Sequence, residues 1–362
     1  YCICRGIVIN CYNTHFHTNT ISCNGRRIIC CIYLDSDAMR KKYKKLVILC
    51  KGNSVTGGSE LVHQLCHELN LLGLDSSIAY YPLGEKHSVP EEYSIYDVKL
   101  SKLDDEHENI IMLPEVATKF AYKIKSAKIA IWWLSVDNYY RMKGDNFIKD
   151  SIKYYKDLLR LRLVPLMFMK NYFHFVQSSY AKEHLSKQGL ESEFLSDYLN
   201  PIHFKQSSKA KEDIILYNPV KGTKITKGLI SANRDFTFIP LEKLNNTQVQ
   251  DLFKRAKLYI DFGNHPGKDR MPREAVMADC CIITGRRGSA NNGVDVPIPQ
   301  KYKFDDSKLV DNPMFREIVS DIFSDYHKNV LNFIKYKDII KNEKTIFKNQ
   351  VSKIFKELLH AK

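Results

Sequence analysis

The stretch GNHPGKDRMPREAVMADCCIITGRRGSA, residues 263–290, decides the fold of this chain. An apolar strand is predicted just before it, over residues 258–262, and a short helix is predicted to begin at Arg273. A second strand follows at 280–284 and ends in a basic glycine loop at 285–289. Strand, cationic turn, helix, strand and second cationic turn are typical of a parallel sheet that holds an anion at its carboxyl edge. The anion that this layout favours is a diphosphate, which indicates a nucleotide-handling enzyme.

Length and charge narrow the class of protein. The 362 residues exceed one ordinary domain and suit two domains of roughly 150 residues each. No apolar run reaches the roughly 18 to 20 residues of a membrane span. The formal net charge of +14 favours a polyanionic partner, which would be nucleic acid, an anionic membrane surface or a phosphorylated substrate. Solvated lysine faces without such a partner are the alternative.

The cysteines gather near the start of the chain, where six of the ten are Cys2, Cys4, Cys11, Cys23, Cys30 and Cys31. The absence of a paired CxxC spacing disfavours a metal site, and the absence of a secretory leader pattern disfavours disulfides. Met39 opens a basic run that leads into an apolar strand at 46–50, as at a natural start. We therefore expect residues 1–38 to be an extension outside the functional fold. The remaining cysteines are expected to be reduced core residues of a cytoplasmic protein.

The first predicted domain spans residues 39–205 and opens with a βαβ unit. The strand at 46–50 precedes a glycine loop, a helix that begins at Ser59 and a strand at 77–81. Ser59 is the expected cap of that helix, because its hydroxyl can accept a hydrogen bond from the first turn. Later elements are predicted as strands at 109–113, 129–134 and 173–177, with helices at 119–126 and 180–188.

The second predicted domain spans residues 206–325. It follows an interdomain linker predicted at 200–212, where the chain is polar, lysine-rich and contains a proline. Its elements are predicted as strands at 213–217 and 236–239 and a helix at 246–256, which Asn246 or Thr247 would cap. Strands and helices alternate in both halves, so the fold class is α/β, with two Rossmann-like, doubly wound domains.

The last part of the chain has a helical pattern from Phe315, and residues 326–362 are predicted to form an amphipathic helix. Its apolar face carries Phe347, Val351, Ile354, Phe355 and Leu358, whereas lysines occupy the other face. Such a helix is expected to pack on its own protein, and contact with a membrane is the alternative.

A segment between Asp137 and Phe175 mixes basic with large apolar residues, most densely in LLRLRLVPLMFMK at 158–170. This mixture is typical of a segment that rests on an anionic bilayer. A covered helix or an acceptor-side loop would have the same composition, so both interpretations stay open.

Three motifs occur in a fixed order along the chain. They are GGSE at 57–60, NPVKG at 218–222 and HPGKDRMPREA at 265–275. In this order the chain resembles GT-B glycosyltransferases, of the retaining, nucleotide-sugar-using kind found in bacterial capsule and lipopolysaccharide gene clusters. The resemblance covers about residues 45–345. It implies two Rossmann-like domains that face a cleft, with the donor on the second, the acceptor on the first and a C-terminal helix that crosses back to the first.

Sugar transfer leaves a nucleoside diphosphate, so negative charge grows on the β-phosphate as the glycosidic bond breaks. An enzyme without a metal meets that charge with preorganised cations and backbone N–H groups. No DxD-like motif stands at a strand end in the motif loops, so no metal and no cofactor are expected. The expected donor-binding residues are Gly57, Gly58, Asn218, Lys221, Gly267, Lys268, Arg270 and Glu274. The expected catalytic residues are Lys221, Arg270, His265 and Asp137.

Glu274 matches the second glutamate of the family's Glu–seven residues–Glu pattern, and the resemblance implies that it binds the ribose hydroxyls. The first glutamate would fall at Pro266 and is absent, and His265 is the expected substitute contact to the donor sugar. Asp137 follows the strand at 129–134 and is the expected carboxylate for a base. Trp132 and Trp133 precede it and suit either a sugar-binding wall or the core.

The predicted function is metal-independent transfer of a sugar, as in a hexosyltransferase, to a bacterial surface glycan or lipid-linked acceptor, with retention as the favoured outcome. The enzyme is expected in the cytoplasm, with possible peripheral contact to the inner face of the cytoplasmic membrane, and no nucleic-acid partner is expected. Two alternatives stay open. One is a sugar-nucleotide epimerase on the same fold, and the other is a basic nucleic-acid-binding protein.

Overall fold

The computed structural model describes residues 19–23, 26–30, 42–142, 147–204, 210–306, 309 and 312–360. The chain forms two compact units, Tyr1–Lys42 and Tyr43–Lys362. In the first unit, β1 (Asn19–Cys23) pairs antiparallel with β2 (Arg26–Cys30). Most of the extension predicted at 1–38 lies outside the described residues, and so do its cysteines Cys2, Cys4, Cys11 and Cys31.

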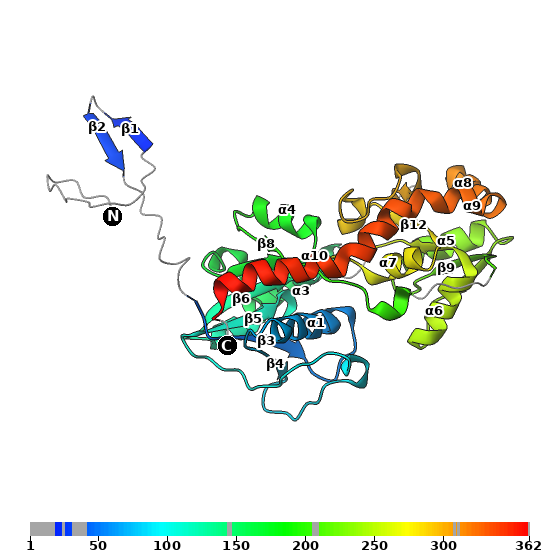
Figure 1. Cartoon of the computed structure of the whole chain (residues 1–362). Coiled ribbons are helices and arrows are strands. Elements are labelled where there is room, and N and C mark those ends of the chain that lie inside the picture. The colour runs from blue at the N-terminus through cyan, green and yellow to red at the C-terminus, as the bar shows by residue number, and fades with distance from the viewer. Residues whose placement is uncertain are drawn as a thin grey trace. The chain divides into compact units, whose positions relative to one another are not determined.

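The first half of the large unit is built on a parallel sheet with strand order β4-β3-β5-β6-β7-β8 (Figure 1). Leu46 and Ile48 of β3 belong to one buried cluster, and Val47 and Leu49 belong to another, so the strand is covered on both faces. The strands are β3 (Lys45–Lys51), β4 (Ser76–Tyr81), β5 (Asn109–Pro114), β6 (Lys128–Trp133), β7 (Phe173–Val176) and β8 (Glu193–Phe194).

The helices of this half connect consecutive strands. They are α1 (Gly57–Leu71), α2 (Val136–Tyr139), α3 (Phe147–Leu159) and α4 (Ser179–Lys187), with 3-10 helices η1 (Glu91–Tyr93), η2 (Glu115–Lys123), η3 (Leu166–Phe168) and η4 (Pro201–Phe204).

Two expectations for these helices are wrong. Helix α1 begins two residues before the predicted Ser59, because Thr56 is its cap and accepts a hydrogen bond from the Ser59 N–H. The helix predicted at 119–126 is the 3-10 helix η2, which is interrupted at Ala117 (φ −111°).

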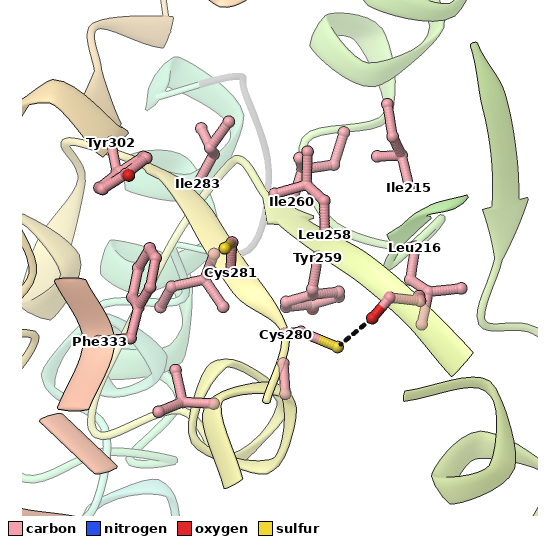
Figure 2. Close-up of a cluster of buried hydrophobic side chains, with 14 of the residues drawn as sticks. Ile215, Leu216, Leu258, Tyr259, Ile260, Cys280, Cys281, Ile283, Tyr302 and Phe333 are labelled. Carbon is pink, nitrogen blue, oxygen red and sulfur yellow. Dashed lines mark hydrogen bonds between the residues drawn. The ribbon is translucent and has the colours of Figure 1, made fainter. Parts of the chain in front are cut away.

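The second half has its own parallel sheet, with strand order β10-β9-β11-β12-β13. Figure 2 shows Ile215, Tyr259, Cys281 and Tyr302 in its buried cluster, which joins strands β9, β11 and β12. The elements are β9 (Glu212–Tyr217), α5 (Thr223–Ala232), β10 (Thr237–Pro240), α6 (Asn246–Arg255), β11 (Ala256–Asp261), α7 (Arg270–Met277), β12 (Cys281–Gly285), η5 (Gly288–Asn291), η6 (Gln300–Tyr302) and β13 (Lys303–Phe304).

Two details of this half also correct the sequence expectations. Helix α7 begins at Arg270, three residues before the predicted Arg273, so it starts inside the basic motif. Helix α6 is capped by Asn245 rather than by Asn246 or Thr247. The Asn245 side chain accepts a hydrogen bond from the Gln248 N–H, and the Gln248 side chain accepts one from the Asn245 N–H. This reciprocal pair explains why Asn245 is the cap.

The C-terminal segment is helical, in the order α8 (Pro313–Ser324), α9 (Tyr326–Val330), η8 (Leu331–Phe333) and α10 (Ile334–Leu358) (Figure 1). Helix α10 contributes Tyr336 and Ile340 to the core of the second half, and Phe347 and Val351 to the core of the first. After the helix, Leu359 forms a parallel bridge with Tyr43. Among the described residues, no helix has the length and apolar character that crossing a membrane requires.

Candidate functional site

The carboxyl ends of the strands in both sheets border a cavity of about 530 Å³. Its walls come from the loop after β3, the first turn of α1, the residues that follow β5 and β6, the turn after β9 and the loop between β11 and α7. Parallel strands bring their carboxyl ends to one edge, so motifs far apart in the sequence meet here. The predicted site residues that line the cavity are Gly57, Gly58, Asn218, Lys221, Gly267, Lys268 and Arg270.

The N-terminus of α1 faces this cavity through its two glycines. Thr56 is held by the Tyr93 hydroxyl, which accepts from its N–H at 2.9 Å and donates to its carbonyl at 2.8 Å. A Cβ on Gly57 would stand 2.9 Å from Cδ of Arg270, so glycine permits the close approach of helix and arginine. The backbone N–H groups and the helix dipole favour an anion at this end.

The turn that carries Lys221 packs against the loop after β11. Gly222 has a φ of +54°, and a Cβ there would stand 2.2 Å from the carbonyl oxygen of Phe262. Only glycine fits this left-handed position and this close approach. Asn218 shapes the same turn, because its side-chain oxygen accepts a hydrogen bond from the Val220 N–H at 3.0 Å. Lys221 is therefore fixed at the cavity wall by backbone packing.

Lys221 belongs to a group of four ionisable side chains, of which Asp261 and His265 are buried and Lys221 and Asp269 are partly exposed. Its Nζ lies 2.5 Å from Oδ2 of Asp269, and His265 Nδ1 lies 2.9 Å from the same oxygen. Asp261, whose Oδ1 is 3.8 Å from His265 Nε2, completes the group. Burial opposes charge on Lys221 and on His265, yet Asp261 and Asp269 raise the pKa of both. The two carboxylates therefore favour the charged forms of both Lys221 and His265.

The same group offers a set of metal ligands. Ligand atoms of Asp261, His265 and Asp269 lie within 4.8 Å of one another, so these residues could hold a metal ion. The Lys221 ammonium contacts one of these three residues, Asp269. His265, the expected contact to the donor sugar, is 1% exposed, is not among the residues that line the cavity, and lies against Asp269.

Arg270 links the two halves of the large unit at the cavity. Its guanidinium contacts Glu60 in the first turn of α1, and its Nε lies 3.3 Å from Oε1 of Glu274. Glu274 also lies 3.5 Å from Nε2 of His203. Glu274 does not line the cavity, so it supports Arg270 from behind in this structure, whereas Arg270 itself reaches the cavity.

A second ion network lies behind Lys268. Its Nζ is 2.8 Å from Oε1 of Glu343 on α10 and 3.5 Å from Oδ1 of Asp197. Arg273 is fully buried and donates to the same two carboxylates, at 2.6 Å to Asp197 and 2.7 Å to Glu343. Burial raises the pKa of Asp197, but Arg273 and Lys268 lower it below its usual value overall. No local pattern predicted Asp197 or Glu343, because they lie 76 and 70 positions from Arg273.

In the first half of the large unit, Glu115 lines the cavity and Asp137 does not. Glu115 directly follows β5 and is 2% exposed, and its Oε2 accepts a hydrogen bond from the Leu134 N–H at 3.1 Å. Asp137 accepts instead from the Tyr180 hydroxyl at 2.7 Å, behind the wall. A carboxylate placed immediately after a predicted strand is the sequence signal that would have identified Glu115.

Trp132 and Trp133 are core residues on opposite faces of the sheet. The Trp132 indole donates to the carbonyl oxygen of Leu195 at 2.9 Å, and the Trp133 indole donates to Nδ1 of His174 at 3.1 Å. Both indole N–H groups are therefore satisfied inside the fold, so these side chains form no aromatic wall for a sugar.

Glu115 should make stability fall as pH rises. Burial raises the pKa of its carboxyl to about 8, so the folded protein holds a proton that the unfolded chain releases near its ordinary pKa. The contribution of the Glu115 carboxyl to the free energy of unfolding is complete below its pKa in the unfolded chain, and it is lost as pH rises towards 8. We expect Glu115→Gln to flatten this dependence when urea unfolding is measured from pH 5 to pH 9. An unchanged slope would show that Glu115 is ionised in the folded state.

Comparison with known proteins identifies the fold. No protein-family model matches the sequence, and no curated protein matches it either. HepE from Anabaena, in complex with UDP-glucose, matches with a TM-score of 0.58 and 10% identity over 87% of this chain and 100% of HepE. The trehalose-6-phosphate protein from E. coli, bound with UDP-2-fluoro glucose, gives 0.56 and 10% over 87% of this chain and 100% of its own.

A third solved structure agrees. Sucrose-phosphate synthase from Thermosynechococcus elongatus matches with a TM-score of 0.54 and 10% identity, over 86% of this chain and 95% of that protein. These neighbours are GT-B glycosyltransferases. The chain has the GT-B fold. Its two parallel sheets with connecting helices are the α/β architecture predicted from the alternating elements.

Proposed function

We propose that this chain is a glycosyltransferase that moves a sugar from a nucleotide diphosphate-sugar to a glycan or lipid-linked acceptor. The observation that carries the proposal is the meeting of Lys221, Lys268 and Arg270 with the N-terminus of α1 at one cavity. Each cation is already held by a carboxylate, so little reorganisation is needed when phosphate charge arrives. GT-B neighbours with UDP-glucose or UDP-2-fluoro glucose bound support a UDP-sugar as donor.

In the proposed reaction, Lys221 and Arg270 bind the diphosphate that departs as the glycosidic bond breaks, with N–H groups of Gly57 and Gly58. His265 and Asp269 orient Lys221, while Glu60 and Glu274 orient Arg270. The resemblance of the three motifs supports a metal-independent, retaining transfer of a hexose. It also supports a bacterial surface glycan, such as capsule or lipopolysaccharide, as product.

Glu115 is proposed to contact the acceptor hydroxyl, because it is the acceptor-side carboxyl at the cavity. Asp137, the base expected from the sequence, accepts a hydrogen bond from the Tyr180 hydroxyl at 2.7 Å. Glu115→Gln keeps the shape of the side chain, so we expect normal donor binding together with a lower rate of transfer. A rate equal to that of the unchanged protein would remove Glu115 from the reaction.

The test of the donor proposal is thermal unfolding with UDP-, GDP-, dTDP- and CMP-sugars. We expect at least one diphosphate sugar to raise the melting temperature in proportion to the logarithm of its concentration. CMP-sugars carry a single phosphate and serve as the matched comparison, with little stabilisation expected. A folded protein that none of the diphosphate sugars stabilises would contradict the proposed function. Release of the free nucleoside diphosphate would then distinguish transfer or hydrolysis from binding alone.

A further inference from the structure

Helix α3 exposes a stripe of large apolar side chains. The stripe has the spacing i, i+4, i+7, i+11, which places its members on one side of a helix. Its members are Ile148 (71% exposed), Ile152 (62%), Tyr155 (63%) and Leu159 (86%). Single exposed apolar residues are ordinary, but four in register on one helix are not.

A basic stripe runs beside the apolar one with the same spacing. It consists of Lys149, Lys153 and Lys156 on α3 and of Arg160 directly after the helix, all of them exposed. At 100° per residue, each basic side chain follows its apolar neighbour by one position around the helix, so the two stripes are adjacent. The exposed part of α3 therefore combines apolar and cationic surface.

A third face holds α3 on the protein. Asp157 is buried and accepts from Nε of Arg141 at 2.8 Å, and Tyr154 packs edge-on against Tyr139 with ring centroids 5.7 Å apart. Leu158 packs against the buried cluster that contains Tyr139. Because α3 already buries one face, the exposed apolar stripe is not the face that attaches the helix to its own core.

The loop that follows α3 extends the apolar surface. Leu161, Met167 and Phe168 are exposed, whereas Leu163 and Val164 between them are buried and anchor the loop. The Tyr139 hydroxyl donates to the Val164 carbonyl at 2.7 Å, which fixes the backbone there. We call the two stripes and these three exposed residues the α3 surface.

We propose that the α3 surface docks on an anionic lipid bilayer. Apolar side chains at the level of the head groups remove their surface from water, and the neighbouring lysines and arginine meet the lipid phosphates. A second copy of the chain fits this surface less well, because a twofold contact with antiparallel helices would bring the basic stripes of both copies together. A bilayer satisfies both stripes at once, and the proposal concerns a surface separate from the residues that line the cavity.

The test is sedimentation of the full chain with phosphatidylcholine vesicles, with and without phosphatidylglycerol. We expect binding only with phosphatidylglycerol, and weaker binding as salt rises. Lys153→Gln/Lys156→Gln should weaken it about fivefold for each charge removed. Ile152→Ser/Leu159→Ser should weaken it about tenfold or more. All four side chains are exposed, so unchanged thermal unfolding would show that these variants fold.

Matched controls lie on the second half of the chain. Leu331→Ser removes a leucine that is 60% exposed, against 62% for Ile152 and 86% for Leu159, and Lys328→Gln/Lys335→Gln removes two exposed lysines. These controls should bind vesicles as the unchanged protein does. Failure of the unchanged protein to bind anionic vesicles would overturn the proposal, as would equal losses in the controls. A dimer that Ile152→Ser/Leu159→Ser disperses, without any vesicle binding, would assign the surface to a second copy instead. None of these measurements uses a sugar donor, so they are independent of the proposed transfer reaction.

Discussion

Replacing Lys221 by methionine is expected to lower donor affinity and turnover together, by about 100-fold or more in kcat/KM. Methionine keeps the length of the side chain and removes its charge from the cavity wall. The lost interaction is strongest when phosphate charge develops, so turnover should fall further than affinity. Donor affinity can be measured by calorimetry, and turnover by release of the nucleoside diphosphate.

A second variant separates binding from folding. Lys221→Met alone leaves Asp269 with one buried cation fewer, which costs stability. Lys221→Met/Asp269→Asn removes one charge of each sign and leaves His265 Nε2 with Asp261, whose Oδ1 lies 3.8 Å away. We expect the double variant to recover much of the stability and none of the donor affinity. Recovery of donor affinity in the double variant would show that Lys221 is structural and contacts no phosphate.

Lys224→Met is the matched control for the loss of one positive charge. Lys224 stands three positions further along, on α5, and is exposed. Its replacement should change donor affinity by no more than about twofold. A loss as large as that of Lys221→Met would show that net charge near the second sheet, rather than a specific contact, governs binding.

The largest effect on stability is expected from Arg273→Met. The guanidinium is fully buried, it donates to Asp197 and Glu343, and its Nε and Nη2 also donate to the carbonyl oxygens of Asp269 and Lys268. Its removal leaves two buried carboxylates with Lys268 as their remaining cation. Breaking a buried pair in this way costs about 3–5 kcal/mol. Urea unfolding monitored by circular dichroism measures the loss.

The double variant Arg273→Met/Glu343→Gln tests the cause of that loss. It leaves Lys268 and Asp197 as a balanced pair, 3.5 Å apart. We expect it to be more stable than Arg273→Met, because an unpaired buried charge is the main cost. Arg316→Met is the comparison on the surface, where a half-exposed arginine pairs with Asp235, and little change is expected. If Arg273→Met and Arg316→Met lose the same stability, the burial of Arg273 does not increase its contribution to the free energy of unfolding.

Local sequence patterns predicted most of the strands and the main helices of both halves, because apolar runs and glycine turns act over a few residues. The observed helix ends differ from the predicted ones where a neighbouring side chain caps the helix. Thr56 rather than Ser59 caps α1, and Asn245 rather than Asn246 or Thr247 caps α6. Helix α7 starts at Arg270, inside the motif that was expected to remain a turn.

The candidate site was predictable only where backbone geometry determines it. Gly57, Lys221 and Arg270 reach one cavity because each follows the carboxyl end of a parallel strand. Whether a side chain points into the cavity or behind its wall depends on partners from distant parts of the chain. Asp137 turns to Tyr180, and Glu115 faces the cavity, although both follow neighbouring strands.

In the 263–290 stretch, the sequence determined some features and the tertiary structure determined others. By itself the sequence determined a basic turn between two parallel strands, suited to phosphate, because alternation, glycines and charges are local properties. The tertiary structure alone decided which of its charges reach the cavity. Arg270 meets Glu60 from 210 positions away, whereas Arg273 is buried between Asp197 and Glu343. A buried charge needs an opposite charge close in space, and only the folded chain supplies it.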